Sequence, residues 1–515
     1  MIAVVKSTAL HGLEGYIVEV EVDIAPGLPS FDIVGLPDTS IREAKDRVRA
    51  AVKNTGLEFP VRRITVNLAP ADHRKEGPLY DLPIAVGILA ATGQLPYDSA
   101  ARFLFWGELS LNGLLRGVNG VLPSVLAARE AGFEEVVVPA ANAAEASLVE
   151  GVKVYPAASL GQVVAFLRGE VSIAPYLPEK EVPGIDTDEV LDLADVKGQQ
   201  GAKRALEVAA AGGHNVLMIG SPGSGKTMLA RRLPGILPGM SSEEALEVTK
   251  IYSLAGLLEP GRPLVTRRPF RSPHHTASVA GLVGGGRSPR PGEVSLAHCG
   301  VLFLDEMPEF PKEALEALRQ PLEDGVISLS RANSSVVYPA RIMLVGAANP
   351  CPCGFYGDRE RPCNCTPYQV SRYLKRLSGP LLDRIDICVE VPRLTVDELS
   401  GTGLGESSAR VRERVEKARQ IQRRRFGDRP RSSAAGRKIY CNAQMGGKDL
   451  AVNCRLTKEA SSLLREAFAR LCLSARTHDK ILKVARTVAD LEGAEEIEVQ
   501  HVAEALQYSK KVPGT

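Results

Sequence analysis

The sequence predicts an α/β protein in which two α/β domains are followed by a helical domain. The central observation is an apolar run, Asn215–Ile219, that leads through a glycine-rich turn into an apolar helix start. This order is typical of a buried strand, a tight turn and a helix. Near the N-terminus, Tyr16–Val22 alternates polar and apolar residues with the period of a half-buried strand. Residues 393–515 show helical periodicity instead.

Residues 1–170 are predicted to form a mixed α/β domain. Residues Ile41–Asn54 place four apolar side chains on one helical face, and Leu82–Leu89 is an apolar helix. The four side chains are Ala44, Val48, Ala51 and Val52. Arg63–Leu68 and Glu134–Pro139 are further strand candidates. Residues 171–194 are rich in Pro, Glu and Asp, which favours a linker.

The second predicted domain spans 195–392 and the third spans 393–515. The second domain contains a long irregular insert, Arg262–Pro291, and a β-hairpin at Val326–Tyr338. In the third domain we expect helices at Ala409–Phe426, Lys458–Leu471 and His478–Leu491, and a loop at Gly427–Gly436.

Overall charge and hydropathy exclude some classes of protein. The net charge is +2, so any nucleic-acid surface must be local. No segment approaches the roughly 18 uninterrupted apolar residues of a membrane-spanning helix. The N-terminus lacks the pattern of a secretory signal. We therefore expect a cytoplasmic protein in a reducing compartment, with no membrane partner.

The glycine-rich turn fits the phosphate-binding pattern G-x-x-x-x-G-K-[ST] at every position. Its backbone N–H groups and the following helix N-terminus would hold the phosphates of ATP. Lys226 would contact the β- and γ-phosphates, and the Thr227 hydroxyl would ligate Mg²⁺. The predicted ATP-binding residues are Gly220, Ser221, Pro222, Gly223, Ser224, Gly225, Lys226 and Thr227.

Two later strands end in polar residues that suit the same site. Val301–Leu304 is followed by Asp305, a second Mg²⁺ ligand, and by Glu306, which could polarise an attacking water as general base. The strand Ile342–Ala348 ends at Asn349, which could bind the γ-phosphate or the water; alternatively, Asn349 simply terminates the strand before a proline.

A cysteine cluster follows Asn349 directly. Four thiols within fifteen residues suit a tetrahedral Zn²⁺ site that pins a loop with little core of its own. A redox pair, or reduced thiols without metal, are the alternatives. The cluster comprises Cys351, Cys353, Cys363 and Cys365, whereas Cys299, Cys388, Cys441, Cys454 and Cys472 are expected to be small buried hydrophobes.

A basic stretch between Arg410 and Arg431 contains ten basic and three acidic residues. An apolar stripe on the same helix would dock it and leave the basic face for phosphates, although a solvated face is the alternative. The hairpin tip adds Arg331 and Asn333.

The order of these motifs resembles the AAA+ ATPases, and within them the clade of magnesium chelatase and the MCM helicases. The insert Ser272–Ala277 and the hairpin carry the closer resemblance. Gly379–Asp386 resembles the arginine-finger motif, which implies that Arg384 acts on the ATP of a neighbouring subunit; a surface ion pair is the alternative. Arg476 resembles the sensor-2 arginine that detects the γ-phosphate. The resemblance implies a homo-oligomeric ring, a hexamer, with a helical lid domain.

The N-terminal domain resembles the proteolytic domain of Lon, with its ribosomal protein S5-like α/β fold, at Glu76–Pro78 and Trp106–Phe133. Lon uses a Ser nucleophile and a Lys base. Here Leu79 follows Gly-Pro, and the segment around Leu122 offers no Lys, so we expect a catalytically inert domain.

Taken together, the three parts resemble the ComM/YifB family over essentially the whole chain. The resemblance implies an ATP-driven ring-forming motor on single-stranded, duplex or branched DNA. Such a motor would act as a helicase in branch migration, during the homologous recombination of natural transformation. A magnesium-chelatase-type motor, a protein-remodelling ATPase and a Lon-type protease are the alternatives, the last opposed by the missing Ser-Lys pair.

Overall fold

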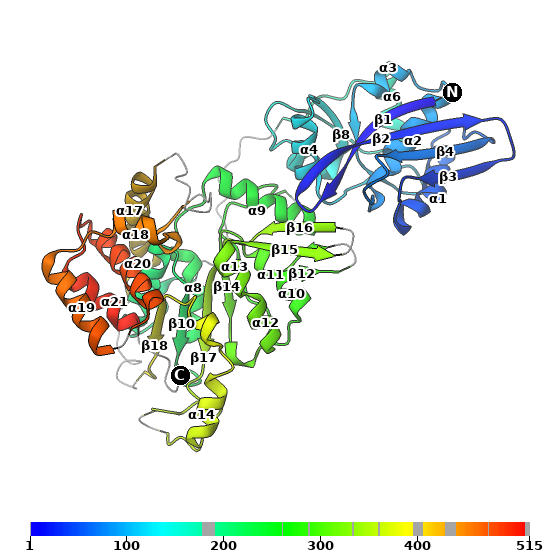
Figure 1. Ribbon diagram of the computed structural model, residues 1–515. Helices are drawn as coiled ribbons and strands as arrows, with labels where there is room; N and C mark the ends of the chain where they lie inside the picture. Colours follow the sequence, from blue (N-terminus) through cyan, green and yellow to red (C-terminus); the bar gives the residue numbers. More distant parts are fainter. Residues whose placement is uncertain are drawn as a thin grey trace. The chain divides into compact units, whose positions relative to one another are not determined.

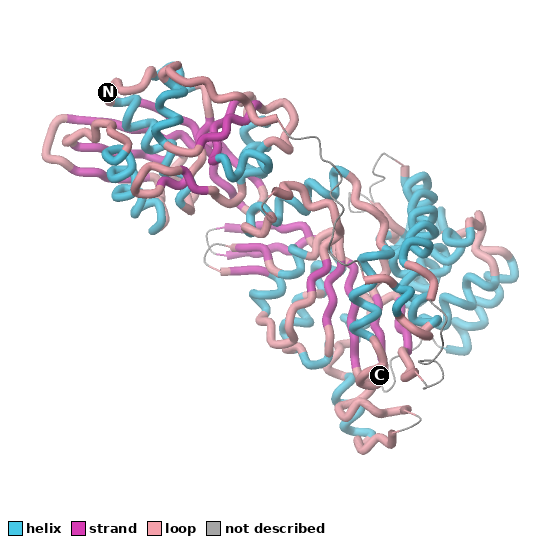
Figure 2. The backbone as a smooth tube through the Cα atoms, turned by 180° about the vertical axis from the view of Figure 1, so that it is seen from behind, coloured by secondary structure: helices cyan, strands magenta, loops and turns pink. Residues whose placement is uncertain are grey.

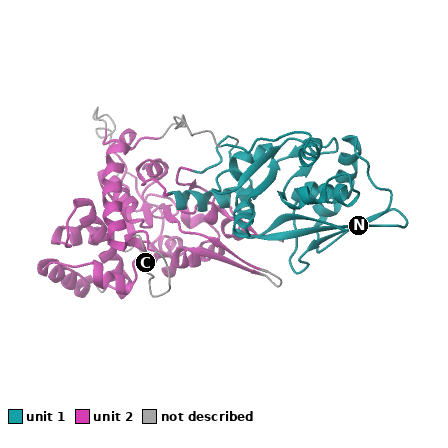
Figure 3. Cartoon of the chain, turned by 90° about the horizontal axis from the view of Figure 1, so that it is seen from above, with its two compact units in different colours: residues 1–185, 242–265 teal, residues 186–241, 266–515 magenta. Residues whose placement is uncertain are grey.

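The computed structural model describes residues 2–177, 191–259, 261–286, 289–331, 334–358, 361–394, 405–427, 439–471 and 473–509. The chain forms two compact units (Figure 3). The first unit comprises Met1–Ile185 and Ser242–Val265, and the second comprises Asp186–Ser241 and Thr266–Thr515. This division into two units does not test the predicted limits of three domains and a linker, which stay a prediction.

The first unit is built on a seven-stranded sheet of order β3-β4-β2-β1-β5-β8-β9 (Figure 1). The strand β2 pairs antiparallel with β1 and β4, and the other pairs are parallel. The strands are β1 (Ile2–His11), β2 (Glu14–Ala25), β3 (Ser30–Val34), β4 (Arg63–Ala69), β5 (Leu104–Phe105), β8 (Glu135–Pro139) and β9 (Lys153–Ala157). The strands predicted in this region are therefore confirmed.

Helices cover both faces of this sheet, because alternate strand residues enter two separate apolar clusters. One cluster receives α1 (Thr39–Asn54), α2 (Asp81–Ala91) and α6 (Leu160–Leu167), and the other receives α4 (Val121–Glu130). The predicted apolar face of α1 is fully buried, and α2 is buried all round.

The helix α9 (Ser242–Ala255) belongs to the first unit although its sequence lies within the predicted ATPase domain. Its apolar residues Ala245, Val248 and Ile251 are buried, and the backbone N–H of Gly120 donates to the Ser253 carbonyl at 3.1 Å. The Ser253 hydroxyl also donates to the buried Glu145. Local periodicity predicts a helix but not the surface on which it packs, so only the tertiary contacts reveal this exchange.

The second unit contains a parallel five-stranded sheet of order β11-β14-β17-β10-β18. Figure 2 shows its strands in magenta with helices beside them. The inner strands are buried on both faces, as parallel sheets require, and read as continuous apolar runs. The strands are β11 (Phe270–Arg271), β14 (Val301–Leu304), β17 (Met343–Ala348), β10 (Val216–Ile219) and β18 (Ile387–Glu390).

Next to this sheet, residues 312–324 form two short helices, α12 (Lys312–Ala317) and α13 (Arg319–Asp324). Pro321 explains the break, because it has no N–H to donate to the carbonyl of Ala317 four residues earlier. The hairpin is confirmed as β15 (Val326–Arg331) and β16 (Ser334–Pro339). The side chains of Arg331 and Asn333 lie outside the described residues.

The insert includes α10 (Val279–Val283) and the short pair β12 (Gly284–Gly285) and β13 (Arg290–Pro291). The helix α7 (Gln200–Gly212), which precedes β10 in the chain, packs against α8 (Lys226–Ile236).

The C-terminal helices share one apolar cluster with α7, α8 and the sheet. They are α17 (Ser408–Phe426), α18 (Gly447–Asn453), α19 (Lys458–Leu471), α20 (Ala475–Glu492) and α21 (Val499–Tyr508), which confirms the predicted helical region. The loop expected at Gly427–Gly436 lies outside the described residues beyond Gly427. Within the described part of the chain, no helix is both long and apolar enough to cross a membrane.

The helical region holds a buried ion-pair network centred on Asp490, whose side chain is 0% exposed. Its carboxylate accepts hydrogen bonds from Arg425 at 2.8 Å, Arg486 at 3.0 Å and Asn442 at 2.8 Å. Arg486 is itself 1% exposed. A buried charge is tolerated only when it is paired, so these groups depend on one another.

We expect Asp490→Ala to destabilise the second unit strongly, because it leaves the buried Arg486 guanidinium without its counter-charge. Breaking a buried pair in this way costs about 3–5 kcal/mol. Urea unfolding followed by circular dichroism measures the loss. Glu496→Ala, which removes an exposed carboxylate nearby, is the control. Equal unfolding midpoints for the two variants would contradict the expectation.

Candidate active site

The phosphate loop connects β10 to α8 at the carboxyl end of the parallel sheet. A Cβ at Gly220 would lie 2.2 Å from the Val391 carbonyl oxygen, so the strand end admits only glycine there. Gly225 has φ +93° and forms the N-cap of α8. The free N–H groups of the first helical turn therefore face the loop, as phosphate binding requires.

Lys226 lies against its own loop. Its Nζ donates to the carbonyls of Gly220 at 2.6 Å and Ser221 at 3.0 Å, and to Asn349 Oδ1 at 3.2 Å. Burial lowers the pKa of Lys226 below its usual value, and the carboxylates of Asp305 and Glu306 act in the opposite direction. A bound polyphosphate would supply the negative charge that offsets this burial.

The two predicted Mg²⁺ ligands meet directly, because the Thr227 hydroxyl donates to Asp305 Oδ2 at 2.7 Å. The other oxygen of Asp305 accepts from the N–H of Glu306 at 2.9 Å. Paired hydroxyl and carboxylate oxygens beside a phosphate loop are the donor set that Mg²⁺ prefers. The structure thus brings together Lys226, Thr227, Asp305 and Asn349 from three strand ends.

Glu306 has a left-handed backbone with φ +50°, uncommon for a residue with a side chain. Its carboxylate lies 3.6 Å from Nδ1 of His275, a residue of the insert. The His274 ring packs on the His275 ring with centroids 4.1 Å apart. The sequence motif Ser272–Ala277 indicates only a resemblance to a clade, and it does not predict that His275 lies beside the Glu306 carboxylate. The adjacent histidines in an insert were the available signal.

Arg384 and Arg476 lie away from the phosphate loop of their own chain. The Arg384 carbonyl accepts from Asn215 Nδ2 at 2.8 Å, and Asn215 precedes β10. The two arginines therefore stand at the amino end of the sheet, about 16 Å of strand from Gly220. Arg384 pairs with Glu323 at 2.5 Å, and Arg476 pairs with Asp383 at 2.8 Å.

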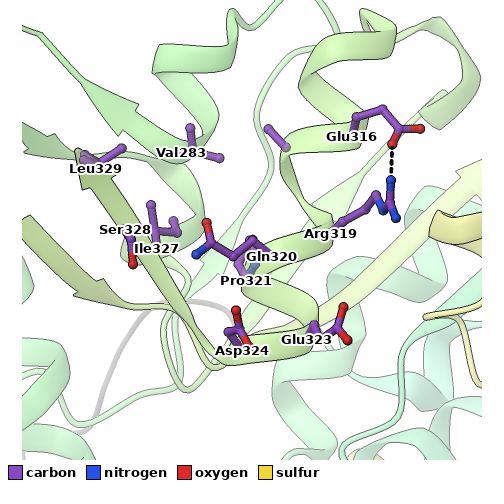
Figure 4. Close-up of a pocket in the computed structure, with 11 residues that line it drawn as sticks. Val283, Glu316, Arg319, Gln320, Pro321, Glu323, Asp324, Ile327, Ser328 and Leu329 are labelled. Atoms are coloured by element: carbon purple, nitrogen blue, oxygen red, sulfur yellow. Dashed lines mark hydrogen bonds and ion pairs between the residues drawn. The ribbon is translucent and has the colours of Figure 1, made fainter. Parts of the chain in front are cut away.

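A pocket of about 440 Å³ lies between α12, α13 and β15, and Figure 4 shows residues that line it. Its wall includes Glu323, the partner of Arg384, and an ion pair of Glu316 with Arg319. No phosphate-loop residue lines this pocket, so it is distinct from the nucleotide site.

The four clustered cysteines converge in space. Their ligand atoms all lie within 4.8 Å of one another, and Sγ distances of 3.3, 3.7 and 3.5 Å join Cys351, Cys353 and Cys363. Four thiolates around Zn²⁺ at about 2.3 Å would stand about 3.8 Å apart, so the cluster fits a tetrahedral zinc site. A hydrogen bond from the Phe355 backbone lowers the pKa of Cys353 to about 6, which favours its metal-binding thiolate.

The scattered cysteines largely follow the prediction. Cys299, Cys441 and Cys454 are buried and Cys388 is half-buried, whereas Cys472 lies outside the described residues.

Much of the basic face of α17 is committed to contacts within the second unit. Arg414 pairs with Glu207 and Glu406, and Arg425 pairs with Asp490. Arg423 and Arg424 are exposed, and their side chains have no hydrogen-bond or ion-pair partner in the described residues. The surface left for phosphates is therefore smaller than the sequence count indicates.

In the first unit, Leu79 and Leu122 occupy the positions that the Lon resemblance assigns to the nucleophile and the base. Leu79 is half-buried, and Leu122 is 0% exposed within α4. Two apolar side chains cannot carry nucleophile or base chemistry, which supports an inert domain.

The fold and the site define a P-loop ATPase of the AAA+ class. Three family models match the chain: magnesium chelatase, subunit ChlI, over residues 192–399; subunit ChlI of Mg-chelatase over 20–142; and the subunit ChlI C-terminal model over 405–509.

Two relatives cover nearly the whole chain. The competence protein ComM of Haemophilus influenzae is 48% identical over 99% of this chain and 98% of its own length. The protein YifB of Salmonella typhimurium is 46% identical over 98% of this chain and 97% of its own length. Lon protease 2 of Bacillus subtilis is 27% identical over 27% of this chain and 28% of its own length. The chain belongs to the ComM/YifB family of magnesium-chelatase-like AAA+ proteins.

We expect His275→Ala to lower the rate of ATP hydrolysis about tenfold without changing nucleotide affinity, because Glu306, the expected general base, would lose the imidazole beside its carboxylate. Single-turnover hydrolysis and fluorescent-nucleotide titration separate the two effects. Ser272→Ala, at an exposed position three residues earlier, is the matched control. A loss of affinity with an unchanged hydrolytic rate would refute this role for His275.

Proposed function

We propose that the protein is an ATP-dependent, ring-forming DNA motor that drives branch migration in homologous recombination during natural transformation. The observation that carries the proposal is the separation of Arg384 from the phosphate loop of its own chain, which favours catalysis across a subunit interface. The ComM protein of Haemophilus influenzae is described as a competence protein, which supports the biological setting.

In the proposed site, Lys226 and the loop N–H groups bind the ATP phosphates. Thr227 and Asp305 hold Mg²⁺, Glu306 polarises the attacking water, and Asn349 orients it. Magnesium supplies charge neutralisation on the phosphates when bound. Lys226 contacts Asn349, and Thr227 contacts Asp305. The Glu306 backbone N–H donates to Asp305, and the Glu306 carboxylate lies beside His275.

Arg384 and Arg476 would complete the site of a neighbouring subunit. A guanidinium there stabilises the charge that develops on the transferring phosphoryl group. Both arginines are paired with exposed or half-exposed carboxylates of their own chain, a type of contact that is weak in water. A head-to-tail interface of this kind closes into a ring, and the family resemblance favours a hexamer.

DNA contact is proposed through the exposed arginines of α17 and the β15–β16 hairpin. Arg410, Arg423 and Arg424 are exposed along α17. Guanidinium groups bind phosphates without reading base sequence, as a translocating motor requires. The proposed location is the cytoplasm, where a motor of this kind finds both ATP and DNA.

The four cysteines are proposed to hold a structural Zn²⁺ ion, since all four ligand positions would be filled by protein. The second candidate function is a magnesium-chelatase-type motor or protein-remodelling ATPase. The family models of magnesium chelatase favour it, because one covers the ATPase region and another the C-terminal helices.

The proposal predicts that DNA accelerates ATP hydrolysis, most strongly with a four-way junction. Steady-state hydrolysis is measured with single-stranded, duplex and junction DNA, with Lys226→Ala as the blank. Added salt should weaken the stimulation, because phosphate contacts release counterions. A rate that is indifferent to every DNA would transfer support to the chelatase-type or protein-remodelling function.

A second prediction concerns the arginine finger. Arg384→Ala and Lys226→Ala should each abolish hydrolysis alone, whereas an equal mixture should recover activity at about a quarter of the interfaces of a mixed ring. Those interfaces join an intact phosphate loop to an intact finger. A mixture as inactive as either variant would contradict action in trans, provided that gel filtration shows mixed assemblies.

A further inference from the structure

The four-cysteine lobe, defined as residues 351–358 and 361–365, packs directly on the phosphate loop. We propose that this lobe forms a wall of the nucleotide site, and that Asp358 is a positioning residue that fixes the loop through Ser221. The inference rests on the proposed ATP site and deepens it, because it assigns the metal cluster a part in nucleotide binding. Figure 1 places the lobe between β17, which ends beside the phosphate loop, and α14 (Pro367–Leu374).

The first contact is a hydrogen bond. The Ser221 hydroxyl donates to Asp358 Oδ2 at 2.7 Å. The second oxygen of Asp358 accepts from the backbone N–H of Arg361 at 3.1 Å, in the segment that leads to Cys363. The Asp358 carboxylate thus ties the phosphate loop to the chain between the two cysteine pairs.

The second contact is close packing of backbone against a ring. Gly354 follows Cys353 with φ +86°, and a Cβ there would lie 2.5 Å from Cδ of Pro222. Even a methyl group would collide with this proline. The lobe backbone therefore lies on the second and third residues of the loop, and Gly354 is required for both its conformation and the approach.

The third link runs through the core. Cys351 is 0% exposed and belongs to the same apolar cluster as Ile219, the last residue of β10. Two residues before it, Asn349 accepts from Lys226. One end of the lobe is thus anchored behind the site, and the Asp358 contact holds the other side.

These contacts give the metal cluster a function besides local stability. A short loop with little apolar core keeps a single conformation only while its ligands are held together. When the four thiolates share one ion, Gly354 and Asp358 stay in place and preorganise Ser221 and Pro222 for phosphate. Without the ion, the nucleotide itself must order the lobe and the phosphate loop. The free energy that this ordering costs weakens nucleotide binding.

The experiment measures nucleotide affinity and metal content on the full chain. Parent protein is titrated with a fluorescent ATP analogue before and after zinc removal by a chelator, and bound zinc is measured by mass spectrometry. Asp358→Ala should retain about one zinc per chain but bind nucleotide about tenfold more weakly, as expected for a lost hydrogen bond to a charged group. Asp358→Asn, which keeps an acceptor for Ser221, should restore most of the affinity.

Two further variants sharpen the test. Ser221→Ala combined with Asp358→Ala should be no weaker than either alone, because both remove one contact. Asp98→Ala, which removes an exposed carboxylate of the first unit, is the matched control and should bind as the parent does. Parent-like affinity of Asp358→Ala, or affinity unchanged by zinc removal, would overturn the inference. If the parent binds no nucleotide at all, the proposed ATPase function fails instead.

Discussion

The register of the parallel sheet is the constraint on which the active site depends. Ile219 of β10 pairs with Ala348 of β17, and Leu304 of β14 pairs with Gly346. Because parallel strands end at one edge, the phosphate loop, the Asp305 carboxylate and the Asn349 amide emerge side by side. The same register directs the start of β18, with Arg384, to the opposite edge. One sheet thus explains both which groups meet at the phosphate loop and why the proposed arginine finger lies apart from them.

The groups around the phosphate loop are held mainly by contacts with one another. Lys226 lies on loop carbonyls, Thr227 donates to Asp305, and Ser221 donates to Asp358. Lys226 and Thr227 each have a protein partner whose place ATP or Mg²⁺ can take, whereas the Ser221 contact holds the loop itself. The insert and the four-cysteine lobe each contribute one neighbour, His275 to Glu306 and Asp358 to the loop. The insert and the four-cysteine lobe, which lie outside the main strands and helices, therefore contact residues of the candidate active site.

The first unit carries apolar side chains at the two positions where the Lon resemblance implies reacting groups. Leu79 and Leu122 contribute packing where the Lon resemblance expects reacting groups. This unit also includes α9, a helix whose sequence lies between the phosphate-loop helix and the insert. The chain therefore passes from one unit to the other more than once.

The sequence by itself determined the phosphate loop, its acidic partners and the main strands and helices, because these depend on local periodicity and fixed spacing. The division between α12 and α13 is also encoded locally, by Pro321. Only the tertiary structure decided that α9 packs on the first unit and that Arg425 pairs with Asp490. It also decided that His275 lies beside Glu306 and that Asp358 binds Ser221. Those facts depend on side chains far apart in sequence, and no local pattern records which surfaces will meet.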